Sequence, residues 1–350
     1  MTRNVKLKST RKKMSVHKKK AVALLSGGLD SNLAIRMIQD QGVEVEAVAI
    51  KTPFCDFDCG KGCGHRVKEV ATELGIKLKT IYFGEEYLQM LKNPKHGYGS
   101  GMNPCIDCRS MMYSVAKEHM KKIGAEFIVT GEVLGQRPMS QNKNALSIIE
   151  NETGTMGVVV RPLSSKHLPI TNPEKNGLIK RENLGNIIGR SRKGQLRLAE
   201  KYDISDPPNS AGGCLLTDPI FAKRIKDLYK HNGAIPDIND VELLKLGRHF
   251  RVSGDKKFIV GRSKEENRVL EVLSLKKDLK IMVKDYVGPT CILRGNKPTE
   301  DEIMICARIA VRYSDAPKDN PSIVKIIANQ YKKEISALPL DNESIAKIRI

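Results

Sequence analysis

The stretch Ala21-Val-Ala-Leu-Leu-Ser-Gly-Gly-Leu-Asp-Ser31 decides how this chain folds. Its first five residues are apolar and predict a buried strand, whereas the residues from Asp30 to about Gln41 have the apolar spacing of an amphipathic helix. The two glycines between them let the backbone approach an oxyanion closely. The start of a helix adds unpaired N–H groups and a partial positive charge. The sequence therefore predicts a phosphate-binding turn between a strand and a helix.

The side chains of this turn are suited to a nucleotide. Two serines offer hydroxyl donors, and Asp30 can either cap the helix or hold a Mg²⁺ ion that bridges phosphates. The turn lacks the GxxxxGK[ST] pattern, and with it the lysine that reaches the β- and γ-phosphates in a P-loop. The alternative is a glycine-rich turn in which Asp30 is only a cap. The candidate nucleotide ligands are Ser26, Gly27, Gly28, Leu29, Asp30 and Ser31, together with Gly131 after a later strand.

Outward from this turn, strands and helices alternate as far as about residue 163. Such alternation is typical of right-handed βαβ units, so we predict an α/β fold with a parallel sheet covered by helices on both faces. Further strands are expected at 44–50, 77–83, 126–130 and 157–160. The expected domains are a basic, disordered arm at 1–20, the α/β domain at 21–215, a helical or mixed extension at 216–276 and a small α+β domain at 277–350.

The chain is strongly basic, with 60 Lys and Arg against 40 Asp and Glu and a net charge of +20. Such a charge favours a polyanionic partner, and nucleic acid is the default. The absence of Trp argues against base stacking as the main binding mode. Residues 178–202 are predicted to form a basic helical stretch that contacts an RNA backbone, although a solvated helix face is the alternative. The candidate RNA contacts are Arg137, Arg190, Lys193 and Arg197.

No apolar run is long enough for a membrane span or a signal peptide, so we expect a soluble, cytoplasmic protein with no membrane partner.

Three cysteines form the first candidate sulfur or metal site. In a reducing compartment, clustered cysteines indicate metal or sulfur chemistry rather than disulfides. Cys105 and Cys108 form a CxxC pair, and Cys214 lies far along the chain. Three thiols suit a persulfide and its resolving partner, or an iron–sulfur cluster with one open iron. A structural zinc half-site and a buried core thiol are the alternatives.

A second cluster consists of Cys55, Cys59, Cys63 and His65. Four soft ligands within eleven residues could close a tetrahedral zinc site, although this spacing is not that of a zinc finger. The cluster follows the strand expected at 44–50. Loops at the carboxyl ends of parallel strands surround the ligand crevice of such sheets. A metal site and surface thiols that bind nothing both stay open.

Several motifs resemble those of known families. The turn at 26–31 resembles the PP-loop of N-type ATP pyrophosphatases, which cleave ATP between the α- and β-phosphates and transfer AMP to an oxygen of the substrate. Asn103-Pro-Cys-Ile-Asp-Cys108 and Gly213-Cys214 look like the paired catalytic cysteines of tRNA 2-thiouridylases. Residues 108–113, 129–136 and 161–163 look like the PP-loop domain of tRNA 4-thiouridine synthetases. The N-terminal RNA-binding domain and the rhodanese domain of the latter are not recognisable.

The resemblance implies an ATP-dependent tRNA sulfurtransferase that uses ATP and Mg²⁺. A uridine carbonyl is adenylated and sulfur then displaces AMP, with 4-thiouridine favoured over 2-thiouridine. Asp30 and the three cysteines Cys105, Cys108 and Cys214 would be catalytic, the cysteines acting as [4Fe-4S] ligands or as persulfide and resolving groups. The sulfur donor would be sulfide, a cysteine desulfurase or a sulfur carrier. The alternatives are a PP-loop amidating or nitrile-forming ligase with structural zinc, and a non-enzymatic RNA-binding metal-cluster module.

Overall fold

The structure is a computed structural model that describes residues 19–54, 63–204, 214–328 and 331–350. Contacts between residues divide the chain into two compact units. The first contains the described residues within 1–49, 66–79 and 112–208, and the second contains those within 50–65, 80–111 and 209–350. None of the helices in the described ranges is long and apolar enough to cross a membrane.

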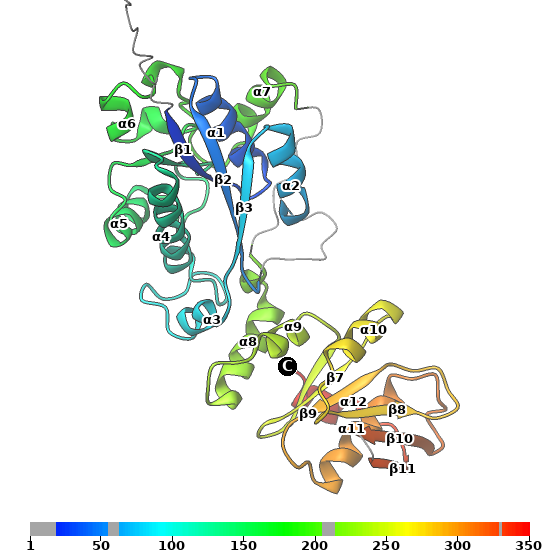
Figure 1. The fold of residues 1–350 in the computed structure, drawn as a ribbon. Helices are drawn as coiled ribbons and strands as arrows, with labels where there is room; N and C mark the ends of the chain where they lie inside the picture. Colours follow the sequence, from blue (N-terminus) through cyan, green and yellow to red (C-terminus); the bar gives the residue numbers. More distant parts are fainter. Residues whose placement is uncertain (1–18, 55–62, 205–213, 329–330) are drawn as a thin grey trace, which may run out of the picture. The chain divides into compact units, whose positions relative to one another are not determined.

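Five strands form the sheet that contains the nucleotide turn (Figure 1). They are β1 (Lys20–Leu24), β2 (Glu44–Lys51), β3 (Lys77–Tyr82), β4 (Phe127–Thr130) and β5 (Val159–Val160). Their order is β3-β2-β1-β4-β5, and β1 pairs in parallel with both β2 and β4. The parallel sheet is confirmed. Since the strand order reverses at β1, the carboxyl ends of β1 and β4 lie at the topological switch point, where α/β sheets bind ligands.

Helices cover both faces of this sheet (Figure 1). On one face, Ile35 and Ile38 of α1 (Leu29–Gln39) and Val67 and Val70 of α2 (Cys63–Glu73) pack with the alanines of β1. Right-handed crossovers in the opposite direction place α4 (Cys105–Ile123) and α5 (Lys143–Thr153) on the other face. The remaining helices before residue 205 include α3 (Glu85–Lys92), α6 (Asn172–Lys175) and α7 (Lys193–Lys201).

Helix α5 forms where no helix was expected from the sequence. The Asn142 side chain accepts a hydrogen bond from the backbone N–H of Ala145 and caps the start of α5. Gly154 ends the helix in the left-handed conformation, with φ of 58°. Both signals are present in the sequence.

The helix expected over 178–202 is wrong for most of its length. Only Lys193–Lys201 is α-helical, and Arg181–Asn183 is a short 3₁₀ turn. Between them the backbone is tied to the end of the sheet. The N–H of Ile187 donates to the carbonyl of Leu163 at 2.8 Å, and that of Gly189 donates to Leu134 at 2.7 Å. These bonds hold residues 187–189 outside a helix, because a helical N–H would bond within its own segment.

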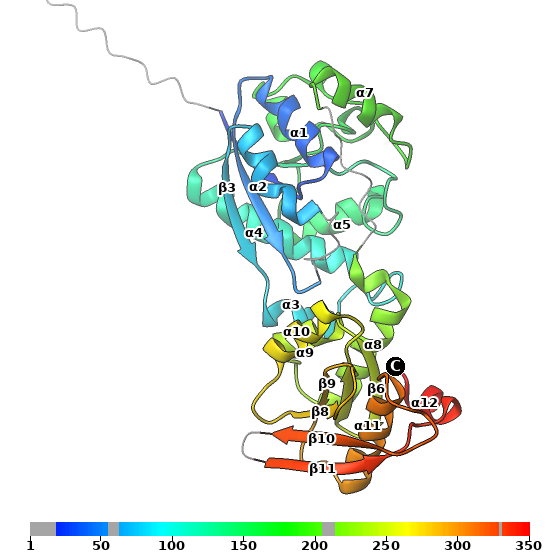
Figure 2. The same cartoon turned by 90° about the vertical axis from the view of Figure 1, so that its right-hand side faces the viewer.

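The second unit contains a six-stranded antiparallel sheet (Figure 2). Its strands are β6 (Arg248–Ser253), β7 (Lys256–Val260), β8 (Leu279–Val283), β9 (Cys291–Arg294), β10 (Ser322–Ala328) and β11 (Tyr331–Ala337), in the order β11-β10-β8-β9-β7-β6. The helices of this part are α8 (Pro219–Asn232), α9 (Ile238–Leu244), α10 (Lys264–Leu273), α11 (Glu300–Arg312) and α12 (Asn342–Ile348).

The face of this sheet that packs against α11 has one continuous core. Ile303 and Ile309 of α11 pack with Phe258 of β7, Ile281 of β8 and Val324 of β10. The boundary expected at residue 276 falls inside the sheet, because β7 pairs with β9 across it. The C-terminal α+β region therefore begins before residue 277, at about the start of β6.

A buried ionic network stabilises the first unit around Arg161. Its guanidinium group donates to Glu132 at 3.0 Å, to Glu150, and to the hydroxyl of Tyr113 at 3.1 Å. That hydroxyl in turn donates to Glu132, which is only 2% exposed. Burial lowers the pKa of Arg161, but the surrounding anionic groups outweigh it and the net shift is upward. The network joins α4, the second residue after β4, α5 and the residue after β5.

Replacing Arg161 with Met should destabilise the first unit strongly. Glu132 and Glu150 would then share a buried site without a cation, which costs about 3–5 kcal/mol. Urea denaturation followed by circular dichroism measures this loss. As a control, Arg66→Met removes a partly exposed ion pair with Glu69 and should cost less than about 1 kcal/mol. Equal losses in the two variants would contradict the assigned role of Arg161.

Candidate nucleotide and cysteine sites

The turn after β1 folds back on itself. Gly27 has a positive φ of 79°, which favours glycine, and Gly28 is the N-cap of α1. The Ser31 hydroxyl donates to the Gly28 carbonyl at 2.9 Å, and the Ser26 hydroxyl lies 3.3 Å from that of Ser31. Asp30 lies in the first turn of α1 and does not cap the helix. The turn thus brings two hydroxyls, a carboxylate and a helix N-terminus to the switch point.

Asp30 is partly buried and surrounded by groups that favour its charged form. Burial raises the pKa of Asp30 and outweighs the opposite effect of Gln136, Arg192, Gln195 and Arg137, so the net shift is upward. The amide of Gln136 donates to the carboxylate at 2.9 Å. Asp30 is therefore a carboxylate fixed by neighbours, as a metal-ion or phosphate-positioning group would be.

Gly131 lets the end of β4 come against this turn. A Cβ atom at Gly131 would lie 2.5 Å from the backbone N of Ser31 and 2.6 Å from the carbonyl carbon of Asp30. Both distances are far shorter than a van der Waals contact, and the atoms involved belong to the backbone, which cannot rotate away as a side chain could. Any side chain at this position would push the turn away from the sheet.

Gln195 is a site residue that the sequence analysis missed. It lies on α7 with a fully buried side chain, and it lowers the pKa of Asp30. Its amide atoms make no hydrogen bond of ordinary geometry with any residue the structure describes. The interaction with Asp30 places this amide beside the carboxylate, so Gln195 belongs to the surroundings of the turn. A single polar residue in a helix gives no signal in the sequence.

The other predicted nucleotide and RNA residues fall into two groups. The Leu29 side chain packs in the core with Leu33 and Ala199, so only its backbone faces the turn. Four arginines and lysines are exposed; they are Arg137, Arg190, Lys193 and Arg197. Arg197 lines a groove of about 600 Å³ between α1, α7 and residues 182–187. A basic surface thus runs along α7, which also reaches Asp30 through Gln195.

The three candidate catalytic cysteines all lie in the second unit and are half-buried. Cys105 and Cys108 occupy the first turns of α4. Asp107, between them, accepts backbone hydrogen bonds from Lys95 at 3.0 Å and His96 at 3.1 Å, which fix this end of the helix.

The backbone brings the segment of Cys214 next to that of the CxxC pair. The N–H of Met102, three residues before Cys105, donates to the carbonyl of Leu216 at 2.9 Å. Gly101 has a φ of 67°, and a Cβ atom there would lie 2.4 Å from the same carbonyl. Only glycine allows this approach. In the sequence Cys214 lies far from the CxxC pair, and the fold joins the two segments that carry them.

The three cysteines fit a metal site only in part. Three thiolates are the right ligands for a cluster or zinc, yet no three His, Cys, Asp or Glu side chains converge on a metal position in the described residues. The three thiols therefore do not form a ready-made metal site. Cys55 and Cys59 lie outside the described residues, and the side chains of Cys63 and His65 are not described.

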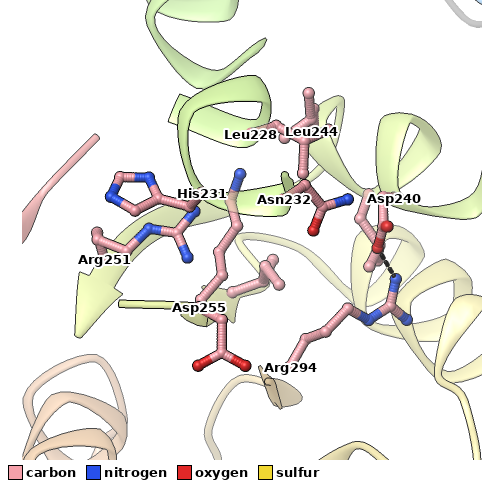
Figure 3. Close-up of a pocket in the computed structure, with 11 residues that line it drawn as sticks. Leu228, His231, Asn232, Asp240, Leu244, Arg251, Asp255 and Arg294 are labelled. Carbon is pink, nitrogen blue, oxygen red and sulfur yellow. Dashed lines mark hydrogen bonds and ion pairs between the residues drawn. The ribbon is translucent and has the colours of Figure 1, made fainter. Parts of the chain in front are cut away.

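A second, much smaller cavity of about 30 Å³ lies in the second unit (Figure 3). Arg294 on its wall is paired with Asp240 at 2.6 Å, and Arg251 is paired with Asp227. Burial lowers the pKa of Lys257, also on the wall, to about 7. The volume is enough for a water or two but too small for a nucleotide.

Two segments of the chain match family models. Residues 16–168 match the family described as thiamine biosynthesis protein (ThiI). The segment that contains the nucleotide turn is therefore similar to this family. Residues 247–349, which hold the six-stranded sheet, match the family described as NFACT protein RNA binding domain.

The relatives of this PP-loop chain are named for tRNA thiolation. A tRNA-specific 2-thiouridylase MnmA of Methylobacillus flagellatus is 26% identical, over 71% of this chain and 69% of that protein. A probable tRNA sulfurtransferase of Methanothermobacter thermautotrophicus is 31% identical, over 56% of this chain and only 43% of that protein. A 4-thiouridine synthetase solved with RNA and ATP has 24% identity and a TM-score of 0.36, over 64% of this chain and 52% of that one. That TM-score is too low to support a functional argument.

Asp30→Asn should weaken Mg²⁺-dependent ATP binding by about tenfold or more, because a charged partner is lost. The variant should keep or gain thermal stability. Burial raises the pKa of Asp30, so its ionised form at neutral pH is less favourable in the folded protein than in the unfolded chain. Calorimetric titration and thermal unfolding measure the two effects. A fall in stability that matches the loss of binding would contradict a ligand-binding role.

Gly131→Ala should lower ATP affinity while the sheet stays folded, because the added Cβ displaces the turn. Equilibrium binding of ATP and circular dichroism measure this. Gly254→Ala is the matched control, since a Cβ atom at Gly254 would meet nothing within 4 Å. Equal ATP affinity in both variants would show that the close approach at Gly131 does not matter for the nucleotide.

Proposed function

We propose that this chain is an ATP-dependent tRNA sulfurtransferase. The observation that carries the proposal is the PP-loop at the switch point, where Asp30 accepts a hydrogen bond from Gln136 and feels the charge of two arginines. The same chain carries three half-buried cysteines on two hydrogen-bonded segments. The first feature suits activation by ATP, and the second suits delivery of sulfur.

In the activation step, ATP binds with its phosphates at the helix N-terminus and the hydroxyls of Ser26 and Ser31. Asp30 is the residue that would hold Mg²⁺, which neutralises phosphate charge when bound. A uridine carbonyl oxygen attacks the α-phosphorus, and pyrophosphate leaves. The O-adenylated uridine then has a good leaving group where the carbonyl oxygen was a poor one.

In the sulfur step, one cysteine carries a persulfide, R–S–SH. Its terminal sulfur attacks the activated carbon and AMP leaves with the former carbonyl oxygen. A second cysteine thiolate attacks the carrier sulfur, breaks the bond to the uridine sulfur and leaves a C=S group on the base. The two cysteines end as a disulfide, which a dithiol reductant must reduce. A cysteine desulfurase or sulfur carrier would supply the next persulfide.

The alternative form of the sulfur step uses a [4Fe-4S] cluster held by Cys105, Cys108 and Cys214. The number and type of ligands suit such a cluster, whereas the described positions do not converge on one metal. We therefore derive no step through a cluster. Zinc has no support among the described residues.

The RNA substrate is proposed to be tRNA. Support comes from the net charge of +20, the exposed basic residues of α7 and the match of residues 247–349 to an RNA-binding family. The ThiI match favours 4-thiouridine over 2-thiouridine as the product, although relatives of both kinds exist. Digestion of treated tRNA and mass spectrometry of its nucleosides distinguish the two products.

Of the single variants Cys105→Ser, Cys108→Ser and Cys214→Ser, at least two should lower tRNA thiolation by about 100-fold or more, because the sulfur step needs one carrier and one resolving cysteine. They should leave tRNA-dependent release of pyrophosphate measurable, because pyrophosphate leaves in the activation step. Cys291→Ser is the control for a general effect of losing a cysteine; Cys291 is fully buried in the core of the C-terminal sheet. Thiolation that persists in all three site variants would exclude the proposed sulfur step.

Iron and acid-labile sulfide analysis of anaerobically purified protein separates the two forms. About four irons, lost in Cys108→Ser, would establish the cluster form. Iron-free protein that still thiolates tRNA would establish the persulfide form.

A further inference from the structure

One part of the C-terminal sheet is uncovered on the face opposite α11. On β7 and β9 this face is covered by α9 and α10, through Leu243, Ile259, Leu270 and Ile292. On β8 and β10, Met282 and Ile323 point to the same face and are each 39% exposed. These strands are interior to the sheet, so the exposure is not an edge effect. Among the described residues, this part of the face is open.

We call this region the open sheet face. Its residues on β8, β10 and β11 alternate with the buried ones that pack towards α11. They are Lys280 and Met282 on β8, Ile323, Lys325 and Ile327 on β10, and Lys332, Glu334 and Ser336 on β11.

The strand register arranges lysines and aliphatic residues alternately across the open sheet face. Ile327 lies opposite Lys280 on one side and Lys332 on the other. In the next row, Lys325 lies between Met282 and Glu334. Neighbouring strands are about 5 Å apart, so the backbones at Lys280 and Lys332 are about 10 Å apart. Each aliphatic side chain in these rows thus has a lysine beside it.

The open sheet face carries uncompensated positive charge. Its one acidic residue, Glu334, accepts a hydrogen bond from Lys284 at 3.1 Å. In the parts of the chain that are described, Lys280, Lys325 and Lys332 pair with no carboxylate. An alternative explanation for the lysine on the edge strand β11 is that its charge prevents strand pairing between molecules. That explanation does not apply to Lys280 and Lys325, which lie on interior strands.

We infer that the open sheet face binds the sugar–phosphate backbone of RNA. The inference rests on the proposed function, which supplies tRNA as the partner. Lys280, Lys325 and Lys332 would contact phosphates, and Ile327 and Met282 would contact riboses between them. The face has no aromatic residue, so recognition is by shape and charge rather than by stacked bases. Its aliphatic residues are separated by lysines and form no continuous apolar patch that would insert into a lipid surface.

The test is binding of an unmodified tRNA transcript to the full chain, measured by filter binding at several salt concentrations. The face variant is Lys280→Gln, Lys325→Gln and Lys332→Gln together. The matched control changes three exposed lysines of the same unit, Lys264→Gln, Lys276→Gln and Lys277→Gln. Both variants lose the same charge. Thermal unfolding confirms that both are folded.

The face variant should bind tRNA about tenfold or more weakly, and the control should change less than twofold. The slope of log affinity against log salt should fall by about two to three in the face variant alone, since each phosphate contact contributes slightly less than one. Equal effects in the two variants would overturn the inference, because charge in general would then explain binding. Wild-type protein that prefers phosphatidylserine vesicles to tRNA would also overturn it.

Thiolation of the same transcript, measured by nucleoside mass spectrometry, separates this inference from the proposed function. If the face variant alone loses tRNA binding and the wild-type protein does not thiolate tRNA, the RNA-binding surface is supported and the sulfurtransferase function is rejected. Thiolation with an unchanged KM for tRNA in the face variant would reject the surface and keep the enzyme.

Discussion

The position of the nucleotide turn depends on how firmly the end of β4 is held. Glu132 follows β4 and is fixed by Arg161, Tyr113 and Thr130 in a buried network. Gly131, the residue before it, has no side chain and lies against the backbone of Asp30 and Ser31. Glu132, which the ionic network fixes, is thus adjacent in sequence to Gly131, which contacts the turn through its backbone. Because the network resists displacement of Glu132, it also restrains Gly131 and the turn that Gly131 touches.

The first half of the fold was predictable because its signals are local. An apolar run, two glycines and an amphipathic helix specify a strand, a turn and a helix without any distant residue, and the parallel sheet follows from their repetition. The site around Asp30 was predictable only in part. Gln136 and Gln195 reach Asp30 from segments more than 100 residues away, and nothing in the sequence marks their proximity.

The errors have physical causes too. Residues 187–189 could not be separated from α7 by their basic composition, since their conformation is fixed by hydrogen bonds to Leu163 and Leu134. The C-terminal sheet was only partly predicted, because lysines on its open face interrupt the apolar runs of β10 and β11. A strand with one solvated face has a weaker apolar signal than one buried on both faces. The same weak apolar signal explains why the boundary of the C-terminal domain was expected at residue 276.

The contact between Gly101 and Leu216 has a chemical consequence for the cysteines. The segments of Cys105 and Cys214 are joined by the main chain, through the Met102 hydrogen bond and a glycine that admits a carbonyl. No sulfur atom takes part in that joint. These two main-chain contacts therefore do not depend on the redox state of the sulfur. In the proposed reaction, thiol, persulfide and disulfide could therefore replace one another without breaking either contact.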